Sequence, residues 1–503
     1  MSINRRMAKG ASWMVGLRFF NRGVGFIGTL ILARLLVPED FGLVAMATVF
    51  FAFLVSISNF SVHILLVQKT EIDTADMDSA WSLQVVVGAV QSLVLLLLAA
   101  PVAKFYQEPR LVEIMLVLAL IALLKGCKNI GVVMFQRNMD FSKDFLLMAA
   151  QKLVMFGVTL SAALILRTYW ALILGMLSGA VVECGLSYVM HPHRPRWCRS
   201  RWREIIRFSR WILINNVLNF IANRGPDLIL GRLIGARAVG LFSVGYEVAM
   251  LPSTELVAPI NRAILPGYSR LRETEGGLQK GYLDVIGMIT LLVLPAGIGI
   301  AATVDILVPL LLGDKWLATV PIIYYLAIAG AIGSSFANGG SVFLALGKPH
   351  ITTIIHSIRI SILVPGVFLG TNYGGVGGVA VAYLGVIAIM TVITLTLVLR
   401  LLKLPVWRYL GTVYRPVLAA GTMYSVITLL IHPYIGDYPL WLSALICIGG
   451  GVLVYISVVL GLWMVAGSAM GAESRILTLA AEIMEKRLPA LSGSLRRLSK
   501  RHL

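Results

Sequence analysis

Basic residues inside long apolar runs are the clearest chemical signal in this sequence. A charged side chain facing lipid at the bilayer centre costs at least about 2.5 kcal/mol, so these residues should face water or a partner. Arg18 and Arg22 are four residues apart, which predicts that they share a helix face. Lys125 and Lys128, three apart, are predicted to do the same. The predicted cationic substrate-binding residues are Arg18, Arg22, Lys125, Lys128, Lys152, Arg224 and Arg359.

Acidic residues are fewer in these runs. An excess of cations in the membrane indicates an anionic ligand or a solvated cavity, while structural ion pairs are the alternative. Arg224 and Asp227, three residues apart, are expected to form such a pair. Asp227 and Glu255 are still the candidates for ion coupling, because the occupancy of a carboxyl group can differ between two transport states. The acidic residues in the apolar runs are Glu183, Asp227, Glu247, Glu255 and Asp305.

A stripe of amide side chains precedes Arg224. Asn215, Asn219 and Asn223 follow one another at four-residue spacing, which places them on one face of a helix. Such a stripe either holds neighbouring membrane helices together or lines a pore, and the sequence leaves both open. Amides also suit sugar hydroxyls, so these three residues are the sugar-contacting candidates.

Enzyme motifs are lacking. The sequence holds no Walker motif, no HExxH, and no GxSxG in an α/β setting, and the glycine run at 374–378 leads no nucleotide-binding unit. The four cysteines show no CxxC spacing, so neither a metal site nor a disulfide is expected. We predict a protein that is not an enzyme and has no cofactor.

Composition indicates an all-α polytopic membrane protein. Of 503 residues 58% are hydrophobic and 13% charged, with a mean hydropathy of +0.86. The apolar runs are long enough for helices, which need about 20 residues to cross a bilayer, whereas barrel strands need about 10. About 14 transmembrane helices are predicted, at 10–36, 41–67, 80–104, 112–134, 145–167, 169–190, 208–235, 239–265, 282–304, 319–346, 351–371, 374–400, 412–432 and 439–466.

Charge distribution predicts the orientation. Lys and Arg number 28 in the loops on the side of the N-terminus and 5 on the other side, so both termini are expected in the cytoplasm. The net charge of +19 reflects this bias rather than nucleic-acid binding. The predicted parts are an N-lobe (1–190, six spans), a basic cytoplasmic interlobe segment (191–207), a C-lobe (208–404, six spans), an extra helix pair (405–466) and a cytoplasmic tail (467–503).

Two basic segments are predicted to lie on the membrane surface. Arginine and tryptophan alternate between Arg196 and Arg203, a pattern typical of the cytoplasmic interface. The tail places apolar residues at helical spacing among basic ones, which predicts an amphipathic helix on anionic lipids. A merely solvated basic tail is the alternative.

One stretch of the chain is used twice. Residues 21–43 and 219–241 match at an offset of 198, which places Arg34 on Arg232 and Gly42 on Gly240. A chance match in a Leu- and Gly-rich sequence is the alternative. The functional interpretation is two similar lobes that face each other, each with an arginine on an apolar helix.

The turn at 33–43, Ala-Arg-Leu-Leu-Val-Pro-Glu-Asp-Phe-Gly-Leu, resembles the first inter-helix turn of Wzx-type polysaccharide flippases, closest to the colanic-acid exporter type. The stretches 134–141, 231–233 and 374–378 support the resemblance. It implies the V-shaped arrangement of two six-helix lobes of the multidrug/oligosaccharidyl-lipid/polysaccharide (MOP) superfamily, with a central cationic cavity and an extra helix pair. Lipid II flippases of the superfamily carry an Arg-Asp pair where this chain has Ile27 and Gly28, which argues against a peptidoglycan precursor.

The resemblance also implies a function. The expected protein moves an undecaprenyl-pyrophosphate-linked oligosaccharide across the bacterial cytoplasmic membrane for exopolysaccharide biosynthesis, by alternating access coupled to an ion gradient, as in an antiporter. A cation-coupled multidrug exporter of the same fold is one alternative, which would favour acidic residues in the cavity. A membrane-embedded glycosyltransferase or ligase is another, which would need catalytic carboxylates and large outside loops. Expected partners are the lipid-linked oligosaccharide, anionic membrane lipids, a polymerase and export machinery; the chain is expected to be a monomer.

Overall fold

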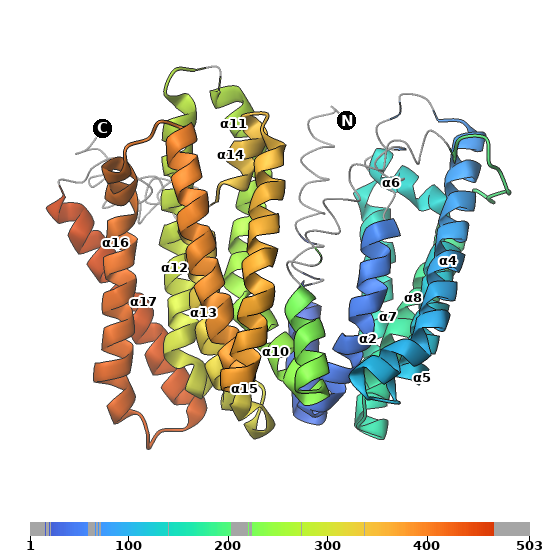
Figure 1. Ribbon diagram of the computed structural model, residues 1–503, viewed down its shortest axis with the longest axis horizontal. Helices are drawn as coiled ribbons and strands as arrows, with labels where there is room; N and C mark the ends of the chain where they lie inside the picture. The colour runs from blue at the N-terminus through green and yellow to red at the C-terminus, as the bar shows by residue number, and fades with distance from the viewer. Residues whose placement is uncertain are drawn as a thin grey trace, which may run out of the picture. The chain divides into compact units, whose positions relative to one another are not determined.

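The computed structural model describes most of the chain as helices (Figure 1). The described ranges are 22–58, 72–138, 140–202, 224–272, 274–336 and 338–466, with the single residues 16, 20, 66, 69 and 220. Each regular element within them is helical. The chain divides into two compact units, Met1–Ser243 and Val244–Leu503, and the division falls inside α10 (Ala236–Ala249).

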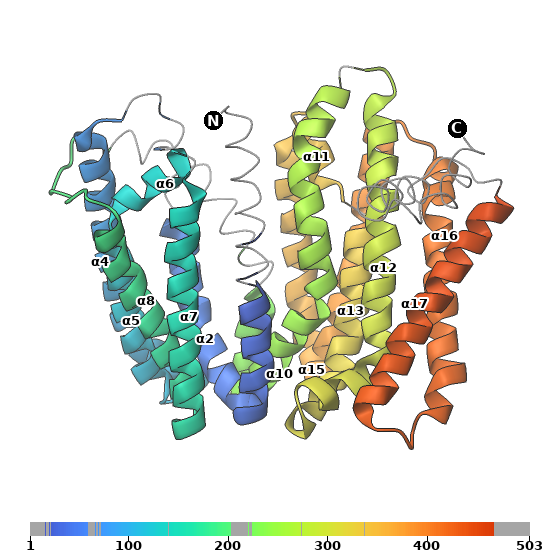
Figure 2. The ribbon, with the colours of Figure 1, turned by 180° about the vertical axis from the view of Figure 1, so that it is seen from behind.

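The first unit is a bundle of long helices. In it α4 packs on α5, α5 on α8 and α7 on α8, while α2 lies against α5 (Figures 1 and 2). Residues 22–35 and 224–233 are also helical. The bounds are α2 (Pro38–Ser58), α4 (Thr74–Tyr106), α5 (Leu111–Gly126), a 3-10 turn (Ile130–Val132), α6 (Val133–Arg137), α7 (Phe141–Leu166) and α8 (Trp170–Met190).

Acidic residues cap the start of α4. The Asp73 carboxylate accepts a hydrogen bond from the Asp76 amide (2.6 Å), and the Asp76 carboxylate accepts one from the Asp73 amide (3.2 Å). This reciprocal pair satisfies two amides that the first helical turn leaves free. Lys69 donates to the same Asp76 carboxylate at 2.6 Å, so this carboxylate also has a basic partner.

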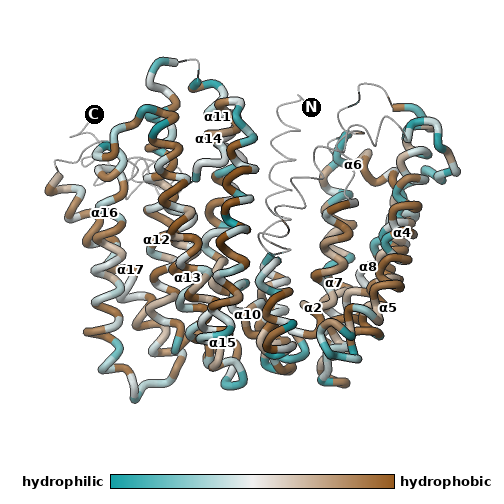
Figure 3. Tube along the Cα trace, viewed as in Figure 1, coloured by the Kyte–Doolittle hydropathy of each residue, from teal (hydrophilic) through white to brown (hydrophobic). Residues whose placement is uncertain are grey.

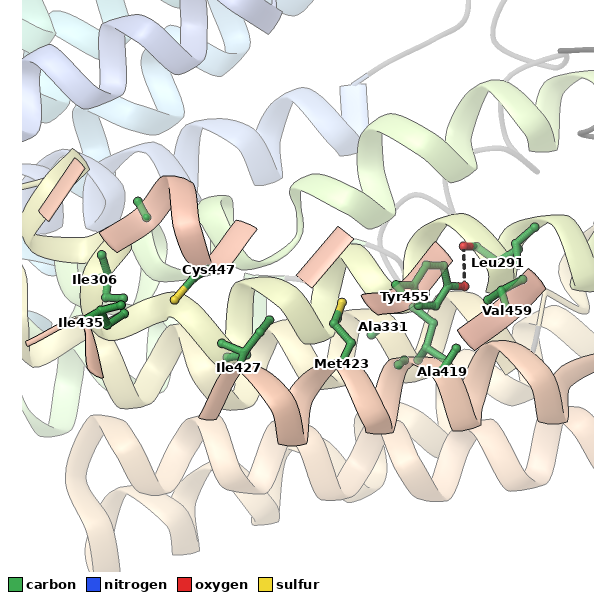
Figure 4. Close-up of a cluster of buried hydrophobic side chains, with 14 residues drawn as sticks. Leu291, Ile306, Ala331, Ala419, Met423, Ile427, Ile435, Cys447, Tyr455 and Val459 are labelled. Atoms are coloured by element: carbon green, nitrogen blue, oxygen red, sulfur yellow. Dashed lines mark hydrogen bonds between the residues drawn. The ribbon is translucent and has the colours of Figure 1, made fainter. Parts of the chain in front are cut away.

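The second unit is built around α12. This helix packs against α13, α16 and α17, and α13 packs against α15. Figure 4 shows the apolar cluster between α12, α16 and α17, where the Tyr455 hydroxyl donates to the Leu291 carbonyl at 2.8 Å. The bounds are a π-helix (Ser253–Val257), α11 (Ala258–Leu271), α12 (Gly277–Leu311), a 3-10 helix (Asp314–Thr319), α13 (Val320–Phe336), α14 (Gly340–Ala345), α15 (Pro349–Leu401), α16 (Val406–Ser425), a second π-helix (Val426–Ile431), a 3-10 turn (His432–Tyr434) and α17 (Leu440–Val465).

The prediction of an all-helical polytopic membrane protein is confirmed. Nine helical stretches within the described ranges are long and apolar enough to cross a membrane, and Figure 3 shows apolar residues along them. Large apolar side chains also face outward, such as Ile165 and Val189 at 80% exposure each, as expected of surfaces that meet lipid. The full count of 14 spans and the six-plus-six division stay predictions.

The eleventh and twelfth predicted spans, 351–371 and 374–400, correspond to the two helical halves of α15, which meet at a break in the backbone. The backbone leaves helical geometry at Gly374 and Gly375, and Gly375 has φ +55°, which favours glycine. Across this break a Cβ on Gly370 would lie 2.5 Å from the Gly378 carbonyl oxygen. The two halves of α15 therefore approach each other backbone to backbone on either side of the glycine run.

Two other predicted spans end or bend early. The fourth, predicted at 112–134, stops at Gly126, where the Gln84 side-chain nitrogen lies 3.1 Å from the carbonyls of Lys125, Gly126 and Lys128 and shares its two hydrogens among them. Those carbonyls would otherwise continue the helix or stay unpaired. The eighth, predicted at 239–265, is interrupted by the π-helix at Ser253–Val257.

Candidate functional site

The two copies of the repeated stretch meet within the first unit. A Cβ on Gly42 would lie 1.7 Å from the Ala236 carbonyl oxygen, and one on Gly240 would lie 1.8 Å from the Pro38 carbonyl oxygen. Ala236 follows Pro38 at the same offset of 198 that relates the glycines. The contact is therefore reciprocal, as expected for related stretches and not for a chance match. We call it the glycine junction (Pro38, Gly42, Ala236, Gly240).

The acidic residues of the first turn fix its shape. The buried Asp40 carboxylate accepts hydrogen bonds from the amides of Val37 (3.1 Å) and Tyr169 (2.9 Å). Glu39 pairs with Arg110 at 2.6 Å, and Arg110 also pairs with Glu108 at 2.8 Å. The hydrogen bond from Arg110 holds the pKa of Glu108 below its usual range. These carboxylates hold the turn that carries Gly42.

Two of the predicted cations are bound by carboxylates. Arg224 pairs with the buried Asp227 at 3.3 Å, which confirms the expected local pair. Lys128 pairs with Glu183 at 2.7 Å, a contact between α8 and the turn after α5. Both pairs reduce the charge that a ligand would meet.

The predicted shared helix face of Lys125 and Lys128 is wrong. Since α5 ends at Gly126, Lys128 lies in the turn beyond it. Lys125 is exposed and its ammonium lies 5.5 Å from the centre of the Phe51 ring, a cation–π contact. The two lysines therefore have separate surroundings.

Lys152 and Arg359 differ from the paired cations. Within the described part of the chain, neither has a carboxylate at ion-pair distance. Lys152 is half-buried on α7, beside Gly25 of the helical stretch 22–35. Arg22 is half-buried on that same stretch. Arg18 lies outside the described residues.

Arg359 lies beside a histidine that the predicted site did not include. His356 precedes Arg359 by three residues on α15, and the Arg359 guanidinium donates to the Tyr383 hydroxyl at 2.9 Å. The signal was in the spacing, since residues three apart are neighbours on a helix. A histidine that looked isolated in an apolar run therefore has a cationic neighbour.

The ion-coupling candidates have contrasting surroundings. Asp227 is only 4% exposed and pairs with Arg224. Glu255 is half-buried in the π-helix Ser253–Val257, a geometry that occurs often at functional sites. The sugar-contacting candidates Asn215, Asn219 and Asn223 lie outside the described residues.

The described part of the interlobe segment, 191–202, packs on the start of α4. The Trp202 indole donates to the Ser79 carbonyl at 3.1 Å, and His193 lies 3.1 Å from the Asp78 carboxylate. The Arg199 guanidinium lies 5.5 Å from the Trp197 ring and 5.4 Å from the Trp202 ring. The alternating Arg and Trp residues therefore contact one another. The predicted tail helix lies outside the described residues.

Comparison with known proteins identifies the family. Residues 31–321 match the family described as polysaccharide biosynthesis protein, which is more than half of the chain. The chain belongs to this family. The resemblance to Wzx-type polysaccharide flippases is thereby confirmed.

Curated relatives of this family member cover most of its length. The lipopolysaccharide biosynthesis protein WzxC of Escherichia coli (strain K12) is 22% identical over 82% of this chain and 84% of its own. The succinoglycan biosynthesis transport protein ExoT of Rhizobium meliloti (strain 1021) is 22% identical over 86% of this chain and 88% of its own. The teichuronic acid biosynthesis protein TuaB of Bacillus subtilis (strain 168) is 21% identical over 71% and 75%.

Solved structures show the same fold. The lipid II flippase MurJ in an inward closed conformation matches with a TM-score of 0.70 at 14% identity, covering 90% of this chain and 99% of MurJ. An inward-facing multidrug resistance MATE family transporter of the MOP superfamily matches with a TM-score of 0.54 at 14% identity, covering 76% and 94%. Together with the apolar helices, this makes the family member a multi-pass protein of the bacterial inner membrane with a MOP-type fold.

Proposed function

We propose that this chain is a flippase that moves an undecaprenyl-pyrophosphate-linked oligosaccharide across the inner membrane for exopolysaccharide biosynthesis. The observation that carries the proposal is the set of predicted intramembrane cations that have no carboxylate partner among the described residues, Lys125, Lys152 and Arg359. Pyrophosphate is anionic, and its passage through hydrocarbon needs a wet, cationic path. Membership of a polysaccharide biosynthesis family supplies the sugar part of the substrate.

The multidrug-exporter alternative suits the charges less well. A cationic drug needs carboxylates that stay free to bind it, and Asp227 and Glu183 are each held by a basic residue. The curated relatives are named for polysaccharide biosynthesis, not for drug export. The fold alone does not separate the two functions, because structures of both kinds match.

The enzyme alternative has less support. A relative named as a transport protein and a structural match named as a flippase favour transport over glycosyl transfer. A ligase would also need catalytic carboxylates exposed outside the membrane.

Alternating access gives the repeat a role. Two related lobes that rock about a substrate site open it to one side at a time. The glycine junction joins the two repeated turns without side chains between them, so that it can close tightly and separate without breaking ion pairs. With both termini in the cytoplasm, as the charge bias favours, these turns lie on the outer side. We propose that the junction opens and closes on that side during the transport cycle.

Ion coupling is assigned to Asp227 and Glu255. Protonation of Asp227 would release Arg224 for a phosphate, since the two now pair at 3.3 Å. Glu255 lies in a π-helix, whose irregular hydrogen bonding can expose carbonyl ligands. Flipping in reconstituted vesicles with proton and sodium gradients imposed separately tests this role. Asp227→Asn or Glu255→Gln should abolish the dependence on whichever gradient matters, and a rate indifferent to both gradients removes the role.

Deletion of the gene followed by lipid extraction tests the function itself. Lipid-linked repeat units should accumulate on the cytoplasmic leaflet while exported polymer is lost, because polymerisation and export act on units already moved outward. Restoring the intact gene should reverse both effects. Normal polymer export in the deletion strain would refute the proposal.

A further inference from the structure

A row of polar side chains runs along the first half of α15. Thr352, His356 and Arg359 follow one another at spacings of four and three, so they share one helix face. The same stripe continues with Leu363 at 2% exposure and Val367 at none. The row therefore faces the interior of the second unit rather than lipid.

Lipid-facing residues occupy the opposite side of this helix. Ile354 is 53% exposed and Phe368 49%, and each lies roughly half a turn away from the polar row. The amphipathic arrangement places the single arginine of this half-helix on its protein-facing side. Snorkelling toward headgroups does not explain a cation on that side.

Each member of the row has a polar atom without a partner. Thr352 Oγ1, His356 Nδ1 and Arg359 Nε are shielded from solvent and make no hydrogen bond to any described residue. Within the described chain Arg359 also makes no ion pair. Buried polar atoms are nearly always hydrogen-bonded, so three unpaired ones on one face call for an explanation. A bound group that accepts hydrogen bonds and carries negative charge supplies it.

Tyr383 holds the cation in place. Its hydroxyl accepts a hydrogen bond from Arg359 Nη2 at 2.9 Å, and the guanidinium carbon lies 5.7 Å from its ring centre. Tyr383 is 3% exposed, and its ring meets the Tyr246 ring edge-on at 6.0 Å. This contact engages Nη2, while Nε has no hydrogen-bond partner among the described residues. A planar guanidinium with a spare edge binds oxyanions well.

We propose that Thr352, His356 and Arg359 form an oxyanion subsite in the second unit, which binds an acidic group of the transported lipid-linked oligosaccharide. The inference rests on the proposed flippase function and adds the residues that hold the charge. From Thr352 to Arg359 the row rises about 10 Å, enough for a diphosphate or one acidic sugar. The oxyanion is therefore either a phosphoryl group of the lipid carrier or a carboxylate on the sugar.

Binding of defined anions to the purified full-length protein tests the subsite. The probes are inorganic pyrophosphate, glucuronate and uncharged glucose, each titrated by calorimetry in detergent. The intact protein should bind at least one of the two anions. Arg359→Gln should weaken the binding of that anion about tenfold or more, the factor that corresponds to loss of one charge-assisted hydrogen bond. His356→Gln should weaken it several-fold, and Arg359→Lys should keep part of the affinity.

A matched control lies on the lipid side of the same helix. Ser361 is exposed and its hydroxyl donates to the Ser357 carbonyl within α15, so Ser361→Ala should bind both anions like the intact protein. Preference for pyrophosphate identifies the phosphoryl group as the ligand, and preference for glucuronate identifies the carboxylate. If Arg359→Gln fails to fold, Arg359→Lys and His356→Gln carry the test.

Equal anion affinity in the intact protein, Arg359→Gln and His356→Gln would overturn the subsite, as would binding of neither anion. This result is separate from a failure of the flippase proposal. A deletion strain that still accumulates lipid-linked units leaves the function standing while the subsite falls. Normal polymer export in that strain would refute the flippase function, whatever the result of the anion titrations.

Discussion

Gly42→Ala is expected to force the glycine junction apart. The added Cβ would lie 1.7 Å from the Ala236 carbonyl oxygen, 2.5 Å from its carbon and 2.9 Å from the Gly240 nitrogen. All three atoms are backbone, so no side chain can rotate away, and the junction must widen by roughly 1.5 Å to reach ordinary contact. Overpacking of this kind costs about 1–3 kcal/mol.

The cost falls on the closed junction only, because the methyl group clashes with nothing once the turns separate. A bias of about 1–3 kcal/mol changes the balance between closed and open states by about 5–150-fold. A cysteine at Val239, next to the junction and fully buried, reports the open state. The four native cysteines are all unpaired, and substituting them gives a background for this single-cysteine reporter.

Alkylation of Val239→Cys by a membrane-impermeant maleimide measures the effect. Gly42→Ala should raise the labelling rate by about 5–150-fold, because the rate is proportional to the population of the open state. Gly225→Ala is the control, because a Cβ there meets nothing within 4 Å. Labelling at the same rate in Gly42→Ala, Gly225→Ala and the parent would refute the reasoning. A lower thermal stability with unchanged labelling would also refute it, since the junction would then be a static packing site.

Three further outcomes are expected. Lys128→Gln should lower the free energy of unfolding by about 1–3 kcal/mol, because Glu183 loses its partner in a partly buried place; adding Glu183→Gln should recover part of the loss in thermal unfolding, and additive losses would contradict the pairing. The hydrogen bond from Arg110 holds the pKa of Glu108 below its usual range, so the stability that Glu108 contributes is present above the unfolded-state pKa near 4.5 and is lost as the pH falls through the lower folded-state pKa. Glu108→Gln should therefore make the thermal stability depend less on pH across that acid window. An unchanged dependence of thermal stability on pH would contradict this. Tyr455→Phe should lower the free energy of unfolding by about 0.5–1.5 kcal/mol, because the hydrogen bond to the Leu291 carbonyl is lost. Tyr434 is exposed, so Tyr434→Phe should change the free energy of unfolding by nothing measurable. Equal effects of the two substitutions would show that the hydrogen bond does not stabilise the core.

Much of the fold follows from the sequence because the bilayer imposes it. A chain with 58% hydrophobic residues in runs of about 20 must satisfy its backbone hydrogen bonds locally, so helices were predictable. The ends of the helices were less predictable. The end of α5 depends on Gln84, which is 42 residues away from Gly126 in the sequence but donates to its carbonyl. No local pattern at 112–134 contains that contact.

Some contacts of the candidate site could likewise be predicted from the sequence, and others could not. The Arg224–Asp227 pair was predictable since three residues separate its members on one helix. The Lys128–Glu183 pair was not, because 55 residues separate them and two elements must pack before they meet. The offset of 198 suggested the repeat, but the reciprocal contact of Gly42 and Gly240 depends on packing.

The sequence by itself determined the class of the protein, the presence of intramembrane cations, and the spacing that lines up His356 with Arg359. These features depend on composition and helical periodicity, which are local properties. Tertiary structure decided which cations meet a carboxylate and which stay unpaired within the described residues. Ion pairing acts over a few ångströms between side chains that packing brings together, so the charge left for a substrate is a property of the packed helices and not of the residue order.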